Sequence, residues 1–211
     1  MKIKWFGHSC FLITSDNGTR ILTDPFDEKV GYPLPHTEAE LVTVSHNHYD
    51  HDNVGAVKGE FEHIKDAGNF THGDIVIKGI STFHDELGGA KRGKNIVFVY
   101  SIDGVTICHL GDLGHTLSQE QLKEIGKVDV LLIPIGGIYT ISGDTAIEVI
   151  KSINPGISIP MHYKTKHLSF ELAEPQSFLG KMEGKRHPGN ELTINADNIS
   201  EYPKVVALDY L

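Results

Sequence analysis

Short apolar runs follow one another along the first half of the chain, at lengths typical of β-strands. The strand-like segments there are IKWF (3–6), CFLIT (10–14), RILT (20–23), LVTVS (41–45), IVIKGISTF (75–83), NIVFVYSI (95–102) and VTICHL (105–110). Asn17-Gly18 and Asp103-Gly104 each separate two of these segments, and both dipeptides are typical of tight hairpin turns. The first half therefore predicts strands that pair through short turns.

Helical patterns enter only in the second half. Ser118 and Gln121 form a capping-box pattern at the start of SQEQLKEIG, and further helices are expected in SGDTAIEVIKSI (142–153) and EPQSFLGKME (174–183). The strands expected between and after them are DVLLIPIG (129–136), ISIPM (157–161), ELTIN (191–195) and KVVALDY (204–210). DVLLIPIG is apolar throughout, which indicates a strand covered on both faces. The order of elements predicts an α/β fold in which sheets pack together with helices outside.

The length and composition are those of one globular domain spanning residues 1–211. The chain is 39% hydrophobic and 22% charged, and it shows no repeat, low-complexity tract or linker. The net charge of −9 disfavours broad binding to nucleic acid or anionic membranes. The formation of homo-oligomers is left open.

Nothing in the sequence indicates export or membrane insertion. The segment MKIKWFGHSC lacks the apolar core of a signal peptide, and no apolar run approaches the ~20 residues of a membrane-spanning helix. Cys10 and Cys108 both lie in strand-like segments, where two buried, reduced thiols are expected. These features predict a cytoplasmic protein.

The segment SHNHYDH directly follows the strand at 41–45 and changes this picture. It places three histidines and an aspartate within six positions, in a chain with 13 histidines overall. Imidazoles and carboxylates crowded together usually need a cation to hold them, and histidine is the commonest metal ligand among side chains. His46 and His48 are two residues apart where the chain leaves a strand, so both side chains can point the same way. The cluster predicts a metal site.

Five motifs together resemble the metallo-β-lactamase superfamily of metal-dependent hydrolases. TDP (23–25), SHNHYDH (45–51), TFHD (82–85), HLGDLGH (109–115) and PMHYKT (160–165) follow that family's order and approximate spacing. Within the superfamily the chain is most similar to the branch that contains L-ascorbate-6-phosphate lactonase. The resemblance implies a four-layer αββα sandwich with the metal site at one edge.

The resemblance also implies the ligand set. One ion would be held by His46, His48 and His84, and a second by Asp50, His51 and His162, with Asp112 bridging the two. Asp24 is expected to orient a ligand without binding metal itself. Gly111 and Gly114, on either side of Asp112, would let the backbone approach the ions closely.

Two histidines near these motifs are not expected to bind metal. His109 lies inside a strand, whereas His84 ends one, so His84 is the expected ligand and His109 should pack or hydrogen bond behind the site, to Asp24 or a ligand carboxylate. His8, in FGHSC, is interpreted as a structural histidine.

A metal-dependent hydrolase is the expected function. One or two divalent ions would activate a water molecule, and Asp50 would also orient that nucleophile or pass on its proton. Zinc is the metal expected first, with manganese, iron and nickel as alternatives. The expected substrate is a small anionic metabolite with a lactone or other ester-like carbonyl. A phosphodiesterase or nuclease with the same centre is the alternative, and a redox protein or non-enzymatic binding module fits the motifs less well.

Candidate substrate-binding residues lie near the expected ligands in sequence. Arg92 and Asn95 belong to the glycine-rich segment after His84, and Lys164 follows His162 by two residues. Tyr139 follows the apolar strand at 129–136, and His115 follows Asp112. Each of these residues has a plain structural alternative, such as a solvated loop or a packing role.

Overall fold

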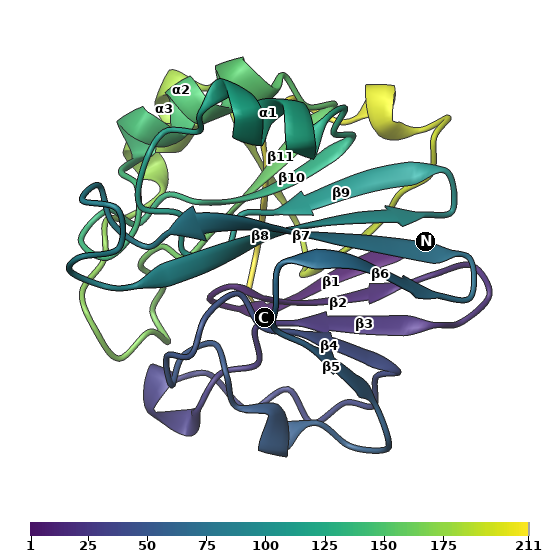
Figure 1. Ribbon diagram of the computed structural model, residues 1–211. Helices are drawn as coiled ribbons and strands as arrows, with labels where there is room; N and C mark the ends of the chain where they lie inside the picture. The colour runs from purple at the N-terminus through teal and green to yellow at the C-terminus, as the bar shows by residue number, and fades with distance from the viewer. Residues whose placement is uncertain (211) are drawn as a thin grey trace.

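Two six-stranded sheets form the body of the protein in a computed structural model that describes residues 1–210 (Figure 1). The first sheet has the order β13-β1-β2-β3-β4-β5. Its strands are β1 (Lys2–Gly7), β2 (Cys10–Thr14), β3 (Arg20–Thr23), β4 (Leu41–Thr43), β5 (Glu62–Ile64) and β13 (Glu191–Thr193). The second sheet has the order β11-β10-β9-β8-β7-β6. Its strands are β6 (Gly68–His72), β7 (Ile75–Phe83), β8 (Lys94–Ile102), β9 (Val105–His109), β10 (Val130–Pro134) and β11 (Ile157–Met161).

Both sheets mix antiparallel hairpins with parallel strands. The two predicted hairpins are confirmed: β2 pairs antiparallel with β3 around Asn17-Gly18, and β8 pairs with β9 around Asp103-Gly104. Strand β10 is buried along its whole length and pairs in parallel with β9 and β11, as its continuous apolar sequence predicted. The carboxyl ends of β7, β9, β10 and β11 therefore meet at one edge of the second sheet.

Three short strands were not predicted. Strands β5 and β6 have polar sequences, EHI and GNFTH, and β12 (Lys185–His187) is a polar segment of three residues that pairs with β14 (Val206–Leu208). Pairing with a neighbouring strand, rather than burial of their own side chains, places these segments in sheets.

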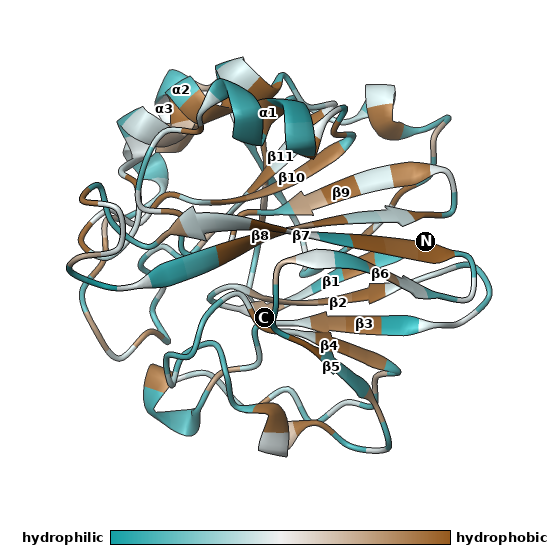
Figure 2. Cartoon of the chain, in the orientation of Figure 1, coloured by the Kyte–Doolittle hydropathy of each residue, from teal (hydrophilic) through white to brown (hydrophobic). Residues whose placement is uncertain are grey.

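The three α-helices lie over the second sheet (Figure 1). They are α1 (Gln119–Ile125), α2 (Gly143–Ile153) and α3 (Gln176–Lys181). The predicted capping box is present at α1, where the Ser118 side chain accepts from the Gln121 backbone and the Gln121 side chain accepts from the Ser118 backbone. Buried apolar residues of both sheets form one core cluster. The strands carry long hydrophobic stretches and α1 is largely hydrophilic (Figure 2).

The outer face of the first sheet carries loops instead of α-helices. The 3-10 turns η1 (Glu28–Val30) and η2 (Val54–Ala56) lie in these loops, while η3 (Ile199–Glu201) lies near the end of the chain. A second apolar cluster fills the space beneath, formed by Cys10, Leu22, Phe26, Val30, Tyr32, Ala39, Val42, Val44, Val57, Leu168 and Leu172. The sandwich is thus confirmed, but the proline- and glycine-rich segment 24–36 cannot supply a long helix on this side.

Hairpin turns join the two sheets at the edge opposite the ends of β7 and β9. The backbone N–H of Asp16 donates to Asp103 Oδ2 at 2.8 Å, and Asn17 Nδ2 donates to Asp74 Oδ1 at 3.2 Å. Cys10 and Cys108 are both buried and not joined in a disulfide, in agreement with the expected thiols. Within residues 1–210, no helix has the length and apolar character needed to cross a membrane.

Candidate metal centre

Loops that follow strands of both sheets bring the predicted ligands together at one edge of the sandwich. The first sheet contributes the segment 46–51 after β4, and the second contributes His84 after β7, Asp112 after β9 and His162 after β11. Loops at strand ends can aim side chains from a rigid scaffold at one point. Residues up to 116 positions apart in the chain thereby share one site.

Asp112 lies at the middle of the cluster. Its Oδ2 atom is 3.2 Å from His84 Nε2, 3.2 Å from His162 Nε2 and 3.3 Å from His51 Nε2. His46 Nε2 lies slightly farther away, at 3.8 Å. Four imidazole nitrogens thus face a single carboxylate oxygen.

The side chains form two adjoining groups around this carboxylate. His46, His48 and His84 bring one nitrogen each within 4.8 Å of one another, and so do the ligand atoms of a second group formed by His8, Asp50, His51 and His162. These groups correspond to the two ion sites implied by the sequence motifs, with His8 as an addition. A third group, His46, His51 and Asp112, overlaps both and connects them.

Buried hydrogen bonds leave Nε2 of two histidines free to face the cluster. The Asp24 carboxylate accepts from the Ser45 backbone N–H at 2.7 Å, from Ser45 Oγ at 2.6 Å and from His51 Nδ1 at 2.9 Å. Because Ser45 Oγ donates to Asp24, it accepts from Nδ1 of His46, 3.0 Å away. Both imidazoles therefore carry a hydrogen on Nδ1, and Asp24 lies where it can orient His51 and, through Ser45, His46.

Several buried polar atoms of the cluster have no hydrogen-bond partner within the described part of the chain. They include Nε2 of His46, His51 and His162 and Oδ1 of Asp112. Native proteins rarely leave buried polar atoms unpaired, because the unpaired atoms lose their hydrogen bonds to water. Imidazole nitrogens and carboxylate oxygens are ligands of divalent transition metals, so this donor set fits such a cation.

The electrostatics also favour positive charge at the centre. Burial opposes the charge of Asp112, but the neighbouring His162 and His51 outweigh it and hold its pKa well below the ordinary range. Burial likewise opposes the charge of His51, yet Asp112 and Asp50 raise its pKa well above the usual value. Burial, together with neighbouring histidines, lowers the pKa of His46 and His48, so these two side chains are neutral and available as ligands.

Backbone strain is concentrated at the same place. His8, Asp24 and His162 have φ angles of 50°, 41° and 50°, in the left-handed region that residues other than glycine seldom adopt. Such a conformation costs about 1–3 kcal/mol and clusters at functional sites. The fold keeps three strained residues where they orient or supply the converging side chains.

Asn95 supports Asp112 from behind, and it lines only the larger of the two hollows that reach the cluster. Its Oδ1 accepts from the Asp112 backbone N–H at 2.9 Å, and its Nδ2 donates to Leu110 O at 3.0 Å. A Cβ atom on Gly111 would lie 2.4 Å from Asn95 Oδ1, and one on Gly114 would lie 2.2 Å from the Asp85 nitrogen. The two glycines therefore allow close contact with Asn95 and the loop after His84.

His109 is buried behind the cluster, as predicted, but its partners are backbone atoms. Its Nδ1 accepts from the Gly111 N–H at 3.1 Å, so its Nε2 carries the hydrogen and donates to the Ser9 carbonyl at 2.9 Å. No carboxylate takes part in these two hydrogen bonds. His109 thus fixes the turn that leads into Asp112.

A hollow of about 280 Å³ opens beside the cluster. It is lined by His48, Tyr49, Asp50, His84, Arg92, Asp112, Tyr139 and Phe170. The Arg92 guanidinium lies 4.8 Å from the centroid of the Tyr139 ring and donates to the Ile138 carbonyl at 3.1 Å. Two of the predicted substrate-binding residues, Arg92 and Tyr139, therefore lie at the hollow.

The other candidates have different positions. The Lys164 ammonium donates to the Leu168 and Phe170 carbonyls at 3.2 and 2.8 Å and pairs with Glu171, so it holds its own loop together. His115 Nε2 accepts from the Phe83 backbone N–H at 3.1 Å, outside the hollow. Proximity in sequence to a ligand did not distinguish these supporting residues from residues that face the hollow.

Asp85 was not singled out by the sequence and organises the loop that carries Arg92. Its carboxylate accepts backbone N–H groups from Leu87, Gly89, Lys91 and Arg92 at 2.7–3.0 Å. Although burial opposes its charge, these hydrogen bonds lower the pKa of Asp85 to about 2. An aspartate directly before a glycine-rich loop was the available signal.

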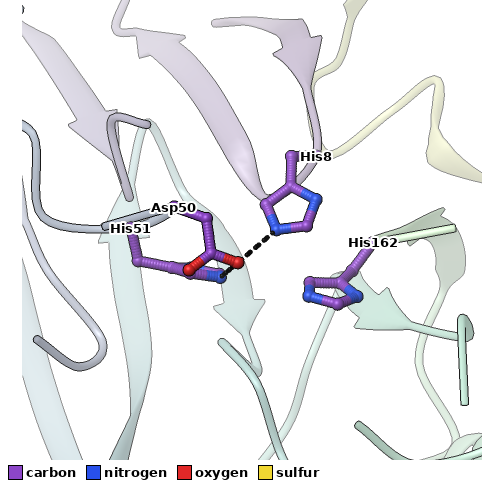
Figure 3. Close-up of side chains that lie close together, drawn as sticks. All are labelled: His8, Asp50, His51 and His162. Atoms are coloured by element: carbon purple, nitrogen blue, oxygen red, sulfur yellow. Dashed lines mark hydrogen bonds and ion pairs between the residues drawn. The ribbon is translucent and has the colours of Figure 1, made fainter. Parts of the chain in front are cut away.

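His8 is the second residue that sequence reasoning did not place in the site. Figure 3 shows its imidazole facing Asp50, with His51 and His162 on either side. It is fully buried, and its Nε2 atom lies 3.1 Å from Asp50 Oδ2. The sequence signal was a histidine after a glycine in a tight turn between two strands.

Comparisons with known proteins agree with this geometry. A family model described as a beta-lactamase superfamily domain matches residues 2–162. A UPF0173 metal-dependent hydrolase from Thermoplasma acidophilum is 32% identical over 206 residues, covering 84% of this chain and 89% of the relative. Another, from Carboxydothermus hydrogenoformans, is 31% identical over 196 residues, covering 78% and 85%.

A crystal structure from Thermotoga maritima is similar over nearly its whole length. It is described as a candidate Zn-dependent hydrolase of the metallo-beta-lactamase superfamily, and it aligns with a TM-score of 0.83 and 44% identity over 98% of this chain and 97% of that one. The matched family model and these relatives together lead to one conclusion. The chain is a metal-dependent hydrolase of the metallo-β-lactamase superfamily and belongs to its UPF0173 family.

Proposed function

We propose that this protein hydrolyses a lactone or another ester-like carbonyl in a small anionic metabolite. The observation that carries the proposal is the hollow beside the metal cluster, because it combines the converging imidazoles with the Arg92 guanidinium. Within residues 1–210, Arg92 forms no salt bridge, so its charge is available to an anionic group. The volume of about 280 Å³ suits a small molecule.

Two divalent ions would be held by the residues that the motifs imply. His46, His48 and His84 would hold one and Asp50, His51 and His162 the other, with Asp112 shared. Zinc is our first choice, because imidazole and carboxylate ligands suit it. When bound, the ions supply a water molecule of lowered pKa and stabilise the negative charge that develops during hydrolysis.

Side chains around the hollow would accept the proton, bind the substrate and exclude water. The Asp50 carboxylate lines the hollow and would take the proton released by the attacking water. Arg92 would bind the anionic group of the substrate, while the Tyr139 ring stacks against the guanidinium and restricts its movement. Tyr49 and Phe170 supply aromatic surface that would exclude water from the bound substrate.

A phosphodiester is the second candidate substrate, favoured by a different hollow. This hollow, of about 600 Å³, includes His46, His48 and Arg92 and is also lined by Lys65, Asp66 and Lys94. Three cations around one opening would suit a larger phosphate-containing molecule. The carbonyl substrate remains our first choice, because Lys65 and Lys94 are exposed and Arg92 serves both hollows.

A substrate panel tests the proposal. After elemental analysis of the purified protein, the metal found is restored and paired substrates are compared: lactones with and without a carboxylate or phosphate group, and a phosphodiester. We expect kcat/KM to be highest for the anionic lactones. If the phosphodiester is cleaved faster than the lactones, and a Lys65→Ala, Lys94→Ala double variant loses that activity, the phosphodiester is the substrate.

A further inference from the structure

His8 lies in a turn that the fold maintains under strain. The turn joins β1 to β2, and Gly7 and His8 within it have φ angles of 103° and 50°. A Cβ atom on Gly7 would lie 2.6 Å from the Tyr32 ring, so this position requires glycine. Nδ1 of His8 is buried without a hydrogen-bond partner in the described residues. An unpaired buried nitrogen and a left-handed histidine are both unfavourable, and neither is expected of a residue that only fills space.

The contacts of the imidazole connect it to the second group of predicted ligands. Its Nε2 atom lies 3.1 Å from Oδ2 of Asp50, and its ring centroid lies 4.1 Å from that of His162 (Figure 3). A carboxylate that binds a cation is ionised and can only accept hydrogen bonds. Nε2 must therefore carry a hydrogen that it donates to Asp50, and a nitrogen that carries hydrogen cannot bind a metal ion.

The backbone of His8 is held as firmly as its side chain. Its carbonyl oxygen accepts from the indole Nε1 of Trp5 at 3.0 Å and from the backbone N–H of His162 at 3.2 Å. The second hydrogen bond ties the β1–β2 turn of one sheet to the end of β11 in the other. The backbones of His8 and His162 are thereby held together, while the His8 imidazole extends to Asp50.

We infer that His8 is a positioning residue for the second metal ion, acting through a hydrogen bond from Nε2 to the Asp50 carboxylate. The hydrogen bond occupies one side of Asp50 Oδ2 and fixes the orientation in which the carboxylate meets His51 and His162. This inference rests on the ligand assignment given under the proposed function. It adds a residue that neither the motifs nor the comparisons assign to the site.

Zinc titration of the metal-free protein tests this role without any substrate. Stepwise affinities are measured by competition with a chromophoric chelator for the parent protein and for His8→Phe and His8→Gln. Phenylalanine keeps a planar ring but removes the donor, whereas glutamine keeps an N–H donor of similar reach. Thermal unfolding of each metal-free variant shows whether it folds, and the visible spectrum of bound Co²⁺ reports the coordination of each site.

We expect the parent protein to bind two ions. His8→Phe should weaken one zinc step by about 10–100-fold and leave the other within about threefold, while His8→Gln should restore most of the loss. The Co²⁺ spectrum should change only for the weakened site. Equal weakening of both steps, or no change, would show that His8 does not position Asp50.

The remaining outcomes separate this inference from the function on which it rests. If His8→Gln loses the step as fully as His8→Phe, His8 binds the ion directly and the positioning role is wrong. If the parent protein itself binds no second ion, the proposed two-metal centre fails and the role of His8 fails with it. If His8→Phe does not fold, the Co²⁺ spectra of the parent protein and His8→Gln are compared instead. A change in coordination between these two proteins would contradict the inference.

Discussion

Asp24 Oδ2 accepts a hydrogen bond from Nδ1 of His51 at 2.9 Å, and both side chains are buried. The two residues follow neighbouring parallel strands, β3 and β4. This pair decides which nitrogen of His51 faces the cluster, because a carboxylate can accept a hydrogen bond but cannot donate one. Asp24 therefore keeps a hydrogen on Nδ1 of His51 and leaves Nε2 directed at the centre.

Asp24→Asn tests that relationship. An asparagine can turn its amide N–H toward Nδ1, which would move the histidine hydrogen to Nε2, where it blocks metal binding. We expect zinc affinity at the second site to fall by about 10–100-fold, as is usual when the partner of a ligand is replaced. Isothermal titration of the metal-free protein measures it, and unchanged affinity would show that the tautomer of His51 is set by other contacts.

His84→Ala and His109→Ala should separate metal binding from stability. Removing His84 deletes a proposed ligand, so metal content should fall while the metal-free protein unfolds at nearly the same temperature. Removing His109 leaves the Gly111 N–H buried without its partner and takes one of two donors from the Ser9 carbonyl, which should cost about 1–3 kcal/mol of unfolding free energy. Denaturant unfolding and elemental analysis are needed for both variants. If only His109→Ala loses metal, His109 is the ligand and His84 has the structural role.

Arg92→Ala should raise KM for anionic substrates about tenfold and leave neutral analogues nearly unaffected, since a hydrogen bond to a charged group contributes about 1.5 kcal/mol or more. Raising the salt concentration should narrow the difference between the two substrate classes. Lys91→Ala is the matched control, because Lys91 lies in the same loop and pairs with exposed Glu86. Equal effects of Arg92→Ala on both classes would remove Arg92 from substrate binding.

Asp85→Asn should disturb the loop of Arg92 and change the acid sensitivity of the protein. The pKa of Asp85 is lowered from 3.8 to about 2 in the folded state, so its ionised form stabilises the fold above pH 4. That contribution disappears as the pH falls through about 2. The stability difference between the parent protein and Asp85→Asn should therefore shrink between pH 4 and pH 2 in thermal melts. A stability difference that stays constant between pH 4 and pH 2 would contradict the lowered pKa of Asp85.

Local patterns predicted the strands, the hairpins and the α/β class, whereas the four-layer sandwich and the ligand set were expected from the resemblance of five motifs to the superfamily. Apolar periodicity identified the long strands, and turn dipeptides identified two hairpins. The loops after β4, β7, β9 and β11 then placed His46, His84, Asp112 and His162 at a common edge. The polar strands β5, β6 and β12 were missed, because a neighbouring strand supplies the stabilisation that their own sequences lack.

Residues around the centre were harder to predict, because their roles depend on direction in space. Asn95 and Lys164 are near ligands in sequence, yet both bond to backbone atoms of the supporting structure. His8 lies 42 positions from Asp50, and the two residues meet because the β1–β2 turn and the loop after β4 lie at the same edge of one sheet. No sequence pattern specifies such a contact in advance.

The two sheets are fastened differently at their opposite edges. At one edge the turns meet through exposed hydrogen bonds between Asp16 and Asp103 and between Asn17 and Asp74, while at the other the buried ligands come from both sheets. Bound ions would therefore act as a cross-link at a single edge of the sandwich. Removing them with a chelator should accelerate amide hydrogen exchange at the ends of β4 and β9 and leave exchange in the distant turns unchanged. The metal would thus govern local opening as well as hydrolysis.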